Sequence, residues 1–315
     1  MDVILVFRTN LRKKIQEILQ AVGYLPVFLV GLLLNMAALR VFFAKRAMWT
    51  DTHIYMLNLA AANCSLMFFL PFRIYNAFHS LDRTPLCTFL ISTHYINMYA
   101  SILTATAISV HRYLAVKYPF HTRAWRSKKV AAVVCGTIWV TVVTICAVFR
   151  EDNNPSKLIT CYEISQDITL SVEFLVVLEV LGYLLPVLIL VFCSTQTIRV
   201  LMKEKDEEED TTVDKKNIIG IVTANLIVFV VCYTPIHLGF LLRFLSKTNK
   251  WESFKLVRDF WLVCEWIATT NCFLDSISYY FLLKRFYFEN SRSAVTHRTD
   301  NESSYPSLHV LHSKQ

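Results

Sequence analysis

Long stretches of the chain carry almost no Asp, Glu, Lys or Arg, and seven such stretches alternate with polar segments. An uncharged run of about 18 residues is long enough to cross a bilayer as an α-helix. The fifth run is interrupted only by Glu179, and the seventh contains Glu265 and Asp275. The pattern therefore predicts seven transmembrane helices, over residues 21–39, 54–72, 85–110, 130–149, 174–198, 217–242 and 260–283.

The composition agrees with a membrane protein. Of the 315 residues, 55% are hydrophobic and 18% are charged, whereas soluble domains average about 45–50% and about 25%. These values exclude a disordered chain and most soluble enzymes. The seven runs do not divide into two similar halves, which argues against transporters built from inverted repeats. A transporter or channel remains an alternative, but it would need paired charges along a path through the membrane.

Basic residues in the loops predict the orientation. The stretch 112–129 contains six Lys or Arg residues and no acid, and Lys and Arg concentrate in short cytoplasmic loops. We therefore expect an extracellular N-terminus (1–20), a membrane domain (21–283), an amphipathic helix on the inner leaflet (284–292) and a disordered cytoplasmic tail (293–315) of a multi-pass plasma-membrane protein. The net charge of +8 does not predict nucleic-acid binding, because no basic block is interleaved with aromatic residues.

The nine cysteines form no C-x-x-C pair, and the chain has no H-E-x-x-H motif. Most of them lie inside apolar runs, where a buried free thiol is the ordinary interpretation. The sequence therefore predicts no metal and no cofactor.

Short motifs in every predicted span resemble those of rhodopsin-like G-protein-coupled receptors. Each motif is weak alone, but they occur in order over residues 20–290. They are GLLLN at 31–35, NLA at 58–60, LPF at 70–72, HRY at 111–113, Trp139, Pro186, FVVCYTP at 229–235 and NCFLDSISY at 271–279. The resemblance implies an all-α membrane protein, a seven-transmembrane helix bundle with a short amphipathic eighth helix. It also implies a receptor rather than an enzyme.

Other fragments are similar to one branch of that family, which holds nucleotide, protease-activated and lysophospholipid receptors. They include LEVLGYLLP at 178–186 and HLGFLLRF at 237–244. The strongest similarity is to receptors for lysophosphatidylinositol and for kynurenate.

The resemblance assigns roles to several residues. It implies a disulfide between Cys87 and Cys161 that joins the third span to the second outer loop. Arg112 would contact the G protein, with a membrane-edge arginine as the alternative interpretation. The residues implied in switching and coupling are His111, Arg112, Tyr113, Phe229, Tyr233, Pro235, Asp275 and Tyr279, and those of the polar core are Asn35, Asn63, Asn97, Ser101 and Asn271.

Three positions depart from the family pattern. His111 stands where an acid usually neutralises the following arginine, so we expect a looser resting state, and His111→Asp should lower basal signalling. Asn63 replaces the usual Asp, and a hard cation prefers carboxylate oxygens, so weak or absent sodium regulation is expected. Ser194 replaces a tyrosine that steadies the active state, which puts efficient activation in doubt.

The ligand site implied by the resemblance lies in the outer halves of the spans. A deep charge such as Arg73 is costly without a partner, so it should meet an anionic ligand or an internal acid, with Glu265 as the resting partner. A purely structural pair of these two residues is the alternative. The expected ligand-binding residues are Arg73, His94, Tyr95, Met98, Tyr99, Glu179, His237, Arg243 and Glu265.

The expected function is that of a receptor for an anionic lysophospholipid or small organic acid that activates a heterotrimeric G protein. The alternative is an atypical or decoy receptor that binds ligand or arrestin without efficient coupling. Membrane lipids surround the bundle, and the serines and threonines of the tail are of the kind that receptor kinases and arrestin target. A plain disordered tail is the alternative interpretation there.

Overall fold

The computed structural model describes residues 2–44, 49–79, 81–82, 84–123, 126–149, 158–164, 171–203, 209–248 and 256–276. Within these ranges the chain forms long helices and one small hairpin. The elements are α1 (Asp2–Ala44), α2 (Asp51–Phe78), α3 (Pro85–Lys117), α4 (Lys128–Val148), β1 (Leu158–Thr160), β2 (Glu163–Ile164), α5 (Val172–Val176), the π-helix η4 (Val177–Leu184), α6 (Leu185–Lys203), α7 (Glu209–Thr248) and a last helix over residues 256–276.

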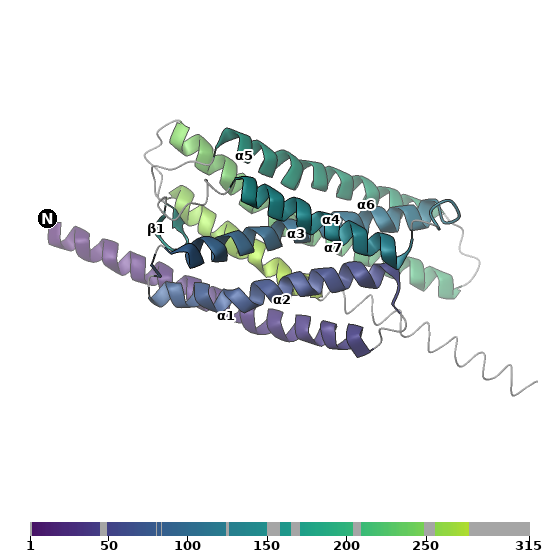
Figure 1. Cartoon of the computed structure of the whole chain (residues 1–315), viewed down its shortest axis with the longest axis horizontal. Helices are drawn as coiled ribbons and strands as arrows, with labels where there is room; N and C mark the ends of the chain where they lie inside the picture. Colours follow the sequence, from purple (N-terminus) through teal and green to yellow (C-terminus); the bar gives the residue numbers. More distant parts are fainter. Residues whose placement is uncertain are drawn as a thin grey trace, which may run out of the picture.

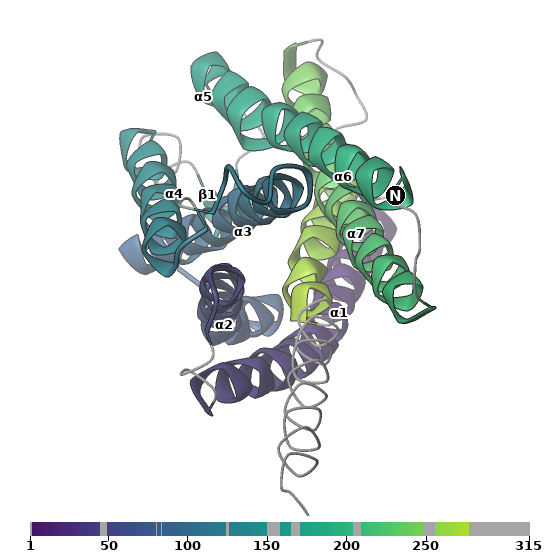
Figure 2. The same ribbon diagram turned by 90° about the vertical axis from the view of Figure 1, so that its right-hand side faces the viewer.

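The long helices run side by side along the long axis of the molecule (Figure 1). Viewed end-on, α3 lies in the interior of the bundle (Figure 2), where it contacts α2, α4, α6 and α7. We call the end that carries the β1–β2 hairpin the outer end and the opposite end the inner end, following the orientation predicted from the basic loops. This arrangement confirms the predicted seven-helix bundle.

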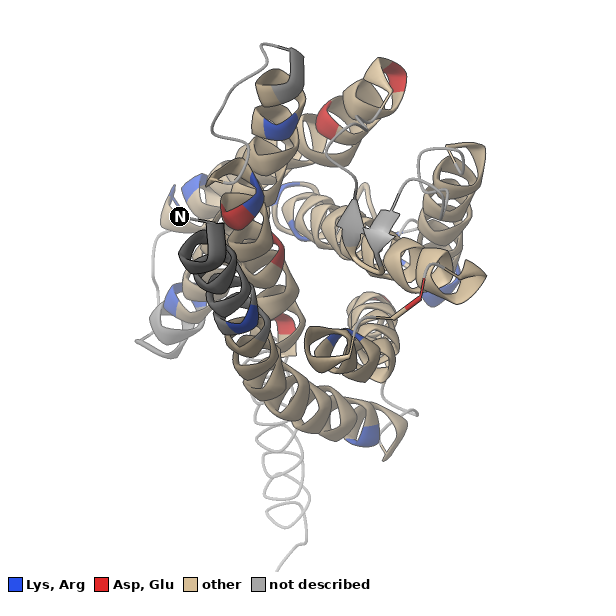
Figure 3. Cartoon of the chain, turned by 90° about the vertical axis from the view of Figure 1, so that its left-hand side faces the viewer, with Lys and Arg blue, Asp and Glu red and all other residues tan. Residues whose placement is uncertain are grey.

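Six helices within the described residues are long and apolar enough to cross a membrane. They are Ile18–Ala44, Asp51–Phe78, Pro85–Lys117, Lys128–Val148, Val172–Lys203 and Lys215–Ser246. The last helix, 256–276, carries Glu265 and Asp275 and corresponds to the predicted seventh span. Charged residues are sparse along all of these helices (Figure 3).

The bundle places apolar side chains outside and polar ones inside. Leu33, Phe68 and Val133 are each about 70% exposed, whereas Asn35 and Thr104 are completely buried. A soluble protein buries its apolar residues. The reverse distribution fits a bundle surrounded by hydrocarbon, in which polar groups must find partners inside the protein.

Polar side chains connect the helices across the interior. The amide of Asn58 on α2 donates to Oγ1 of Thr104 on α3 at 3.0 Å, and its carbonyl oxygen accepts from Nε1 of Trp139 on α4 at 2.8 Å. On the other side, Nδ2 of Asn35 donates to the carbonyl of Cys272 at 2.9 Å and joins α1 to the last helix. These bonds fix which faces of the helices meet.

Local sequence accounts for several helix ends. Pro85 occupies the first turn of α3, where its missing N–H costs nothing. The hydroxyl of Ser127 accepts from the N–H of Val130 at 3.2 Å and caps α4. Prolines also lie inside α1, α2, α6 and α7; they are Pro26, Pro71, Pro186 and Pro235.

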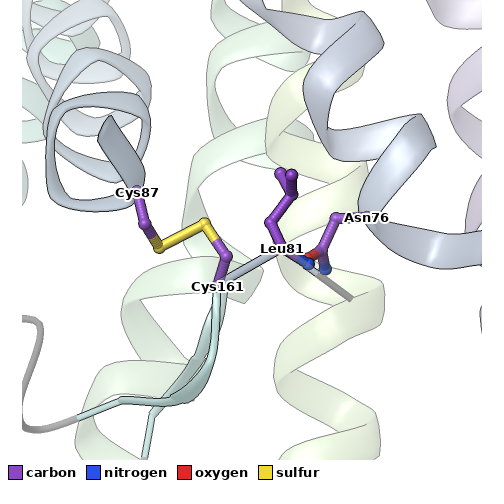
Figure 4. The surroundings of a disulfide bond; sticks show 4 residues. All are labelled: Asn76, Leu81, Cys87 and Cys161. Carbon is purple, nitrogen blue, oxygen red and sulfur yellow. A yellow bond between two sulfur atoms is a disulfide. The ribbon is translucent and has the colours of Figure 1, made fainter. Parts of the chain in front are cut away.

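The outer hairpin is attached to α3 by the disulfide that the family resemblance implies, between Cys87 and Cys161, whose Cα atoms lie 5.5 Å apart (Figure 4). The N–H of Cys161 also donates to the carbonyl of Leu81 at 3.3 Å, and Leu81 in turn donates to Oδ1 of Asn76 at 3.0 Å. Tyr162 follows in the turn with a φ of 72°, a left-handed conformation that is unusual for a residue with a side chain. These contacts hold the second outer loop over the bundle.

Some predictions fall on other parts of the chain. Tyr279, the amphipathic helix 284–292 and the tail 293–315 lie outside the described residues. From Asp2 onwards, the predicted N-terminal segment 1–20 forms the first turns of α1.

Removing the disulfide is expected to destabilise the protein. Cys161→Ser opens a link between residues 74 positions apart, and such links contribute about 2–4 kcal/mol to the free energy of unfolding. We expect lower surface expression in cells and a lower melting temperature of the purified protein. Cys64→Ser changes a free, half-buried cysteine and is the matched control. Equal melting temperatures for the two variants would contradict the prediction.

Candidate functional site

Three predicted residues from three helices meet near the outer end, and we call Arg73, His94 and Glu265 the outer charged cluster. Arg73 on α2 makes a bidentate ion pair with Glu265 on the last helix, with Nη1 2.7 Å from Oε1. Nε2 of His94 on α3 lies 3.7 Å from the same Oε1. All three side chains are more than nine-tenths buried. The guanidinium therefore has the internal acid that the sequence predicted as its resting partner.

Two tyrosines that the sequence did not single out contact Arg73. The rings of Tyr24 on α1 and Tyr162 in the hairpin turn lie 4.8 Å and 5.0 Å from its guanidinium carbon, within the range of cation–π attraction. Burial raises the pKa of Tyr162 to about 12, so its ring stays neutral at physiological pH. Tyr162 directly follows a disulfide cysteine, and this position was the feature of the sequence that could have identified it as part of the site. Tyr24 is an ordinary aromatic residue of the first span and offered none.

A second polar group lies deeper, between α3, η4 and α7. Nδ1 of His237 is 3.3 Å from Oε1 of Glu179, and the imidazole stacks on the ring of Tyr183 with centroids 4.4 Å apart. Within the described residues, Nε2 of His237 and the hydroxyl of Tyr99 are buried without hydrogen-bond partners. The predicted residues Tyr99, Glu179 and His237 are thus brought together. Their unused donors and acceptors could bind a polar group of a ligand.

The backbone around Glu179 explains this close packing. The residues Val177–Leu184 form a π-helix, a local widening that is frequent at functional sites. Gly182 lies in this segment, and a Cβ there would come within 2.5 Å of the ring of Tyr99. Only glycine therefore allows α3 and η4 to approach so closely.

Arg243 on α7 differs from Arg73. Its guanidinium carbon lies 5.7 Å from the ring centroid of Trp261, and the side chain is half-buried. No acid within the described part of the chain forms an ion pair with it. Phe240 packs against both Trp261 and the predicted residue Tyr95, with centroids 4.5 Å and 6.1 Å apart. An unneutralised cation thus lies at the edge of an aromatic wall.

Cavities near the outer end complete this region. One of about 440 Å³ lies between α1 and the last helix, lined by Leu19, Gly23, Tyr24 and Trp266 among others. Tyr24 thus touches both this cavity and Arg73. A much smaller one, of about 20 Å³, is lined by the predicted residues His94, Met98, Asn97 and Ser101.

Near the inner end, Arg112 lines a cavity of about 50 Å³ that extends towards the core. Ser109 and Ser194, whose hydroxyls are 3.4 Å apart, line it between α3 and α6. Asp275 and Tyr233 line its deeper part. Within the described residues no acid lies within ion-pair distance of Arg112.

Two further predicted switch residues, Phe229 and Tyr233, also line this cavity. Their rings pack edge to face with centroids 5.2 Å apart, and both residues precede Pro235 on α7. Tyr113 packs against Phe192 on α6, and its hydroxyl accepts from Nζ of Lys117 at 3.0 Å.

The polar core surrounds Asp275. Nδ2 of Asn271 donates to Oδ2 of Asp275 at 2.8 Å, and Nδ2 of Asn63 lies 3.4 Å from the same oxygen. Asn97 uses its own amide to donate to the carbonyl of Ala62 at 2.6 Å. Two amide groups therefore already point at the carboxylate. Within the described residues no group of three or more His, Cys, Asp or Glu side chains could hold a metal ion.

His111 has a partner that sequence reasoning missed. Its Nε2 lies 2.7 Å from Oδ2 of Asp51, the first residue of α2. Asp51 is the only acid between Glu17 and Asp82. Its isolated position at the edge of a span was the feature of the sequence that could have identified it as a partner. The imidazole therefore points away from the core, towards α2.

Comparison with known proteins agrees with this geometry. Residues 34–279 match the family model described as 7 transmembrane receptor (rhodopsin family). The chain belongs to the rhodopsin family of seven-transmembrane receptors. It is 35% identical to "G-protein coupled receptor 35" of Homo sapiens over 289 residues, covering 91% of each chain. It is 34% identical to "G-protein coupled receptor 55" of Homo sapiens, over 87% of this chain and 88% of the other.

Another relative is "Lysophosphatidic acid receptor 6" of Gallus gallus, 33% identical over 81% of this chain and 87% of the other. The similarity to the lysophospholipid branch is thereby confirmed. As a member of this family the chain is a receptor, not an enzyme, and a multi-pass protein of the plasma membrane.

Neutralising Glu265 is expected to destabilise the receptor strongly. Glu265→Gln leaves the buried guanidinium of Arg73 without its counter-charge, and breaking such a pair costs about 3–5 kcal/mol. Thermal unfolding of the purified receptor in detergent measures this loss. Glu173→Gln changes an exposed acid at the outer end and should leave the melting temperature unchanged. The double variant Arg73→Met, Glu265→Leu should lose less than Glu265→Gln, and the opposite order would contradict this account.

Sodium is expected to have little effect on the receptor. The two amide donors beside Asp275 favour the carboxylate without a cation, and Asn63 contributes no second carboxylate. Replacing sodium chloride by potassium chloride should leave the melting temperature and agonist affinity unchanged. Asn63→Asp should introduce a sodium-dependent increase in melting temperature. A strong sodium effect on the unaltered receptor would overturn the prediction.

Proposed function

We propose that the receptor binds an anionic lysophospholipid or a small organic acid at its outer end and promotes nucleotide exchange on a heterotrimeric G protein at its inner end. The observation that carries the ligand class is Arg243, a half-buried cation without an acidic partner among the described residues. A charge in that position is stabilised by an anion that enters from outside.

The two arginines of the predicted site have different roles in this proposal. Arg73 is already neutralised by Glu265 and covered by Tyr24 and Tyr162. It therefore shapes the site and keeps the helices together. Arg243 carries the charge that remains, so it binds the phosphate or carboxylate of the ligand. A guanidinium is well suited to this because its planar fork donates two parallel hydrogen bonds to such groups.

The surroundings offer room for an apolar part of the ligand. Tyr95, Phe240 and Trp261 form an aromatic wall beside Arg243. The cavity of about 440 Å³ between α1 and the last helix is lined mostly by apolar side chains. An acyl chain would fill it, whereas a small aromatic acid would use the wall alone. Among the relatives, the lysophosphatidic acid receptors favour the lipid by their names.

Arg112 supports the second half of the proposal. It lies at the inner end, without an acidic partner among the described residues, on a cavity that reaches to Asp275. A cation in this position is available to the carbonyl groups at the C-terminal end of a partner helix. Ligand binding outside would shift the populations of two helix arrangements that differ in access to Arg112.

Arrestin and receptor kinases are further partners in this proposal. Serines and threonines recur through the tail, at Ser291, Ser293, Thr296, Thr299, Ser303, Ser304 and Ser307. Phosphate groups there would add negative charge that basic surfaces bind.

Removing the charge of Arg243 tests the ligand half. In cells that express Arg243→Ala, the concentration of lysophosphatidic acid, lysophosphatidylinositol or kynurenate needed for half-maximal nucleotide exchange should rise about tenfold or more, since a hydrogen bond to a charged group contributes about 1.5–3 kcal/mol. Arg258→Ala removes an outer cation that pairs with Asp259 and is the matched control. An equal shift in both variants would indicate general attraction of anions and contradict a specific site.

Replacing Arg112 tests the coupling half. Arg112→Ala should abolish both basal and ligand-driven exchange while surface expression remains. If the unaltered receptor promotes no exchange but recruits arrestin with the same ligands, it is a decoy receptor and the coupling proposal is wrong.

A further inference from the structure

Asp51 brings an imidazole and a guanidinium from different segments together at the inner end, and we call Asp51, His111 and Arg126 the inner charged cluster. Oδ2 of Asp51 lies 2.7 Å from Nε2 of His111 on α3 and 3.9 Å from Nε of Arg126, just before α4. Oδ1 accepts from the backbone N–H of Thr52 at 2.9 Å. The side chains of Asp51 and His111 are only 10% and 12% exposed. Both oxygens of a nearly buried carboxylate are thus in use.

The position of His111 shows why this cluster matters for its neighbour. The imidazole lies against α2, with its ring 5.7 Å from that of the buried Tyr55. The next residue, Arg112, lines the central cavity. Because adjacent helical residues point about 100° apart, holding His111 against α2 fixes the direction in which Arg112 can point.

Arg126 ties the second inner loop to the same carboxylate. Other hydrogen bonds of the described loop residues are local: Thr122 donates to the carbonyls of Tyr118 and Leu114, and the N–H of Arg126 donates to the carbonyl of Thr122. Within the described part of this loop, the contact with Asp51 is therefore the polar link to α2.

We propose that Asp51 is a positioning residue for G-protein coupling: by binding His111 and Arg126 it fixes the inner end of α3 and the second inner loop against α2. The acid of this cluster lies on α2, and its partners are His111 and Arg126 rather than Arg112. The proposal rests on the proposed coupling function for its signalling consequence, but the contact itself can be tested without a G protein.

The structure also changes what His111→Asp would do. The new carboxylate would face Asp51 and be repelled by it, so the single variant would break the link rather than restore an acid to Arg112. The informative change is the exchange of the two side chains, Asp51→His with His111→Asp, which restores a carboxylate and an imidazole across the same gap.

The decisive experiment measures nucleotide exchange and melting temperature on purified full-length receptor in lipid nanodiscs, with one heterotrimer of each major G-protein class. Asp51→Asn, Asp51→His and His111→Asp should each lower basal exchange several-fold, and the exchanged double variant should recover at least half of the loss. The conservative Asp51→Glu should retain most of the exchange. Asp82→Asn, which alters an exposed acid in the first outer loop, should leave exchange unchanged.

Melting temperature tests the contact alone. Asp51→Asn should melt about 3 °C below the unaltered receptor. An unchanged melting temperature in Asp51→Asn, or no recovery in the double variant, would overturn the proposal. If the unaltered receptor promotes no exchange, the coupling function fails, and with it the coupling role of Asp51. The melting temperatures would then still show whether the contact between Asp51 and His111 stabilises the receptor.

Discussion

Hydrocarbon offers no hydrogen bond to a polar group, so each polar side chain inside the bundle needs a partner from the protein itself. The buried pair of Arg73 and Glu265 is the strongest consequence of this constraint. It joins α2 to the last helix, and Tyr24 and Tyr162 then pack on the same guanidinium from α1 and from the hairpin turn. Four separate segments therefore meet on one charge near the outer end.

The same constraint distinguishes charged side chains that are neutralised inside the protein from those that remain available to a binding partner. Arg73, which the sequence predicted to meet an anionic ligand or an internal acid, has its charge neutralised by Glu265. Arg243 and Arg112 have no acidic partner among the described residues, and they lie near opposite ends of the bundle. This contrast supports the proposed function because the two unpaired cations are placed where an outer anion and an inner partner can reach them. Asp51 acts on Arg112 indirectly, because it orients the neighbouring His111 without touching Arg112 itself.

Sequence reasoning succeeded where a signal lies within one segment. The uncharged runs predicted the helices. The family motifs predicted the disulfide and the residues that converge at each end. Contacts between segments were predicted in part: Glu265 was expected as the partner of Arg73, but the partner of His111 was missed. The expectation that His111 loosens the resting state did not include Asp51, because Asp51 lies 60 positions away, on a helix whose approach to α3 no local pattern reveals.

The sequence alone thus determined the number of spans, their order and orientation, and the family, because hydrophobic length and loop charge act on each segment independently of the others. Only the tertiary structure decided which buried charges are satisfied and which remain available. Arg73 and Arg243 are the same residue type, and nothing in their local sequence distinguishes them. Their difference arises because the packing of the last helix brings Glu265 to one guanidinium and an aromatic ring to the other.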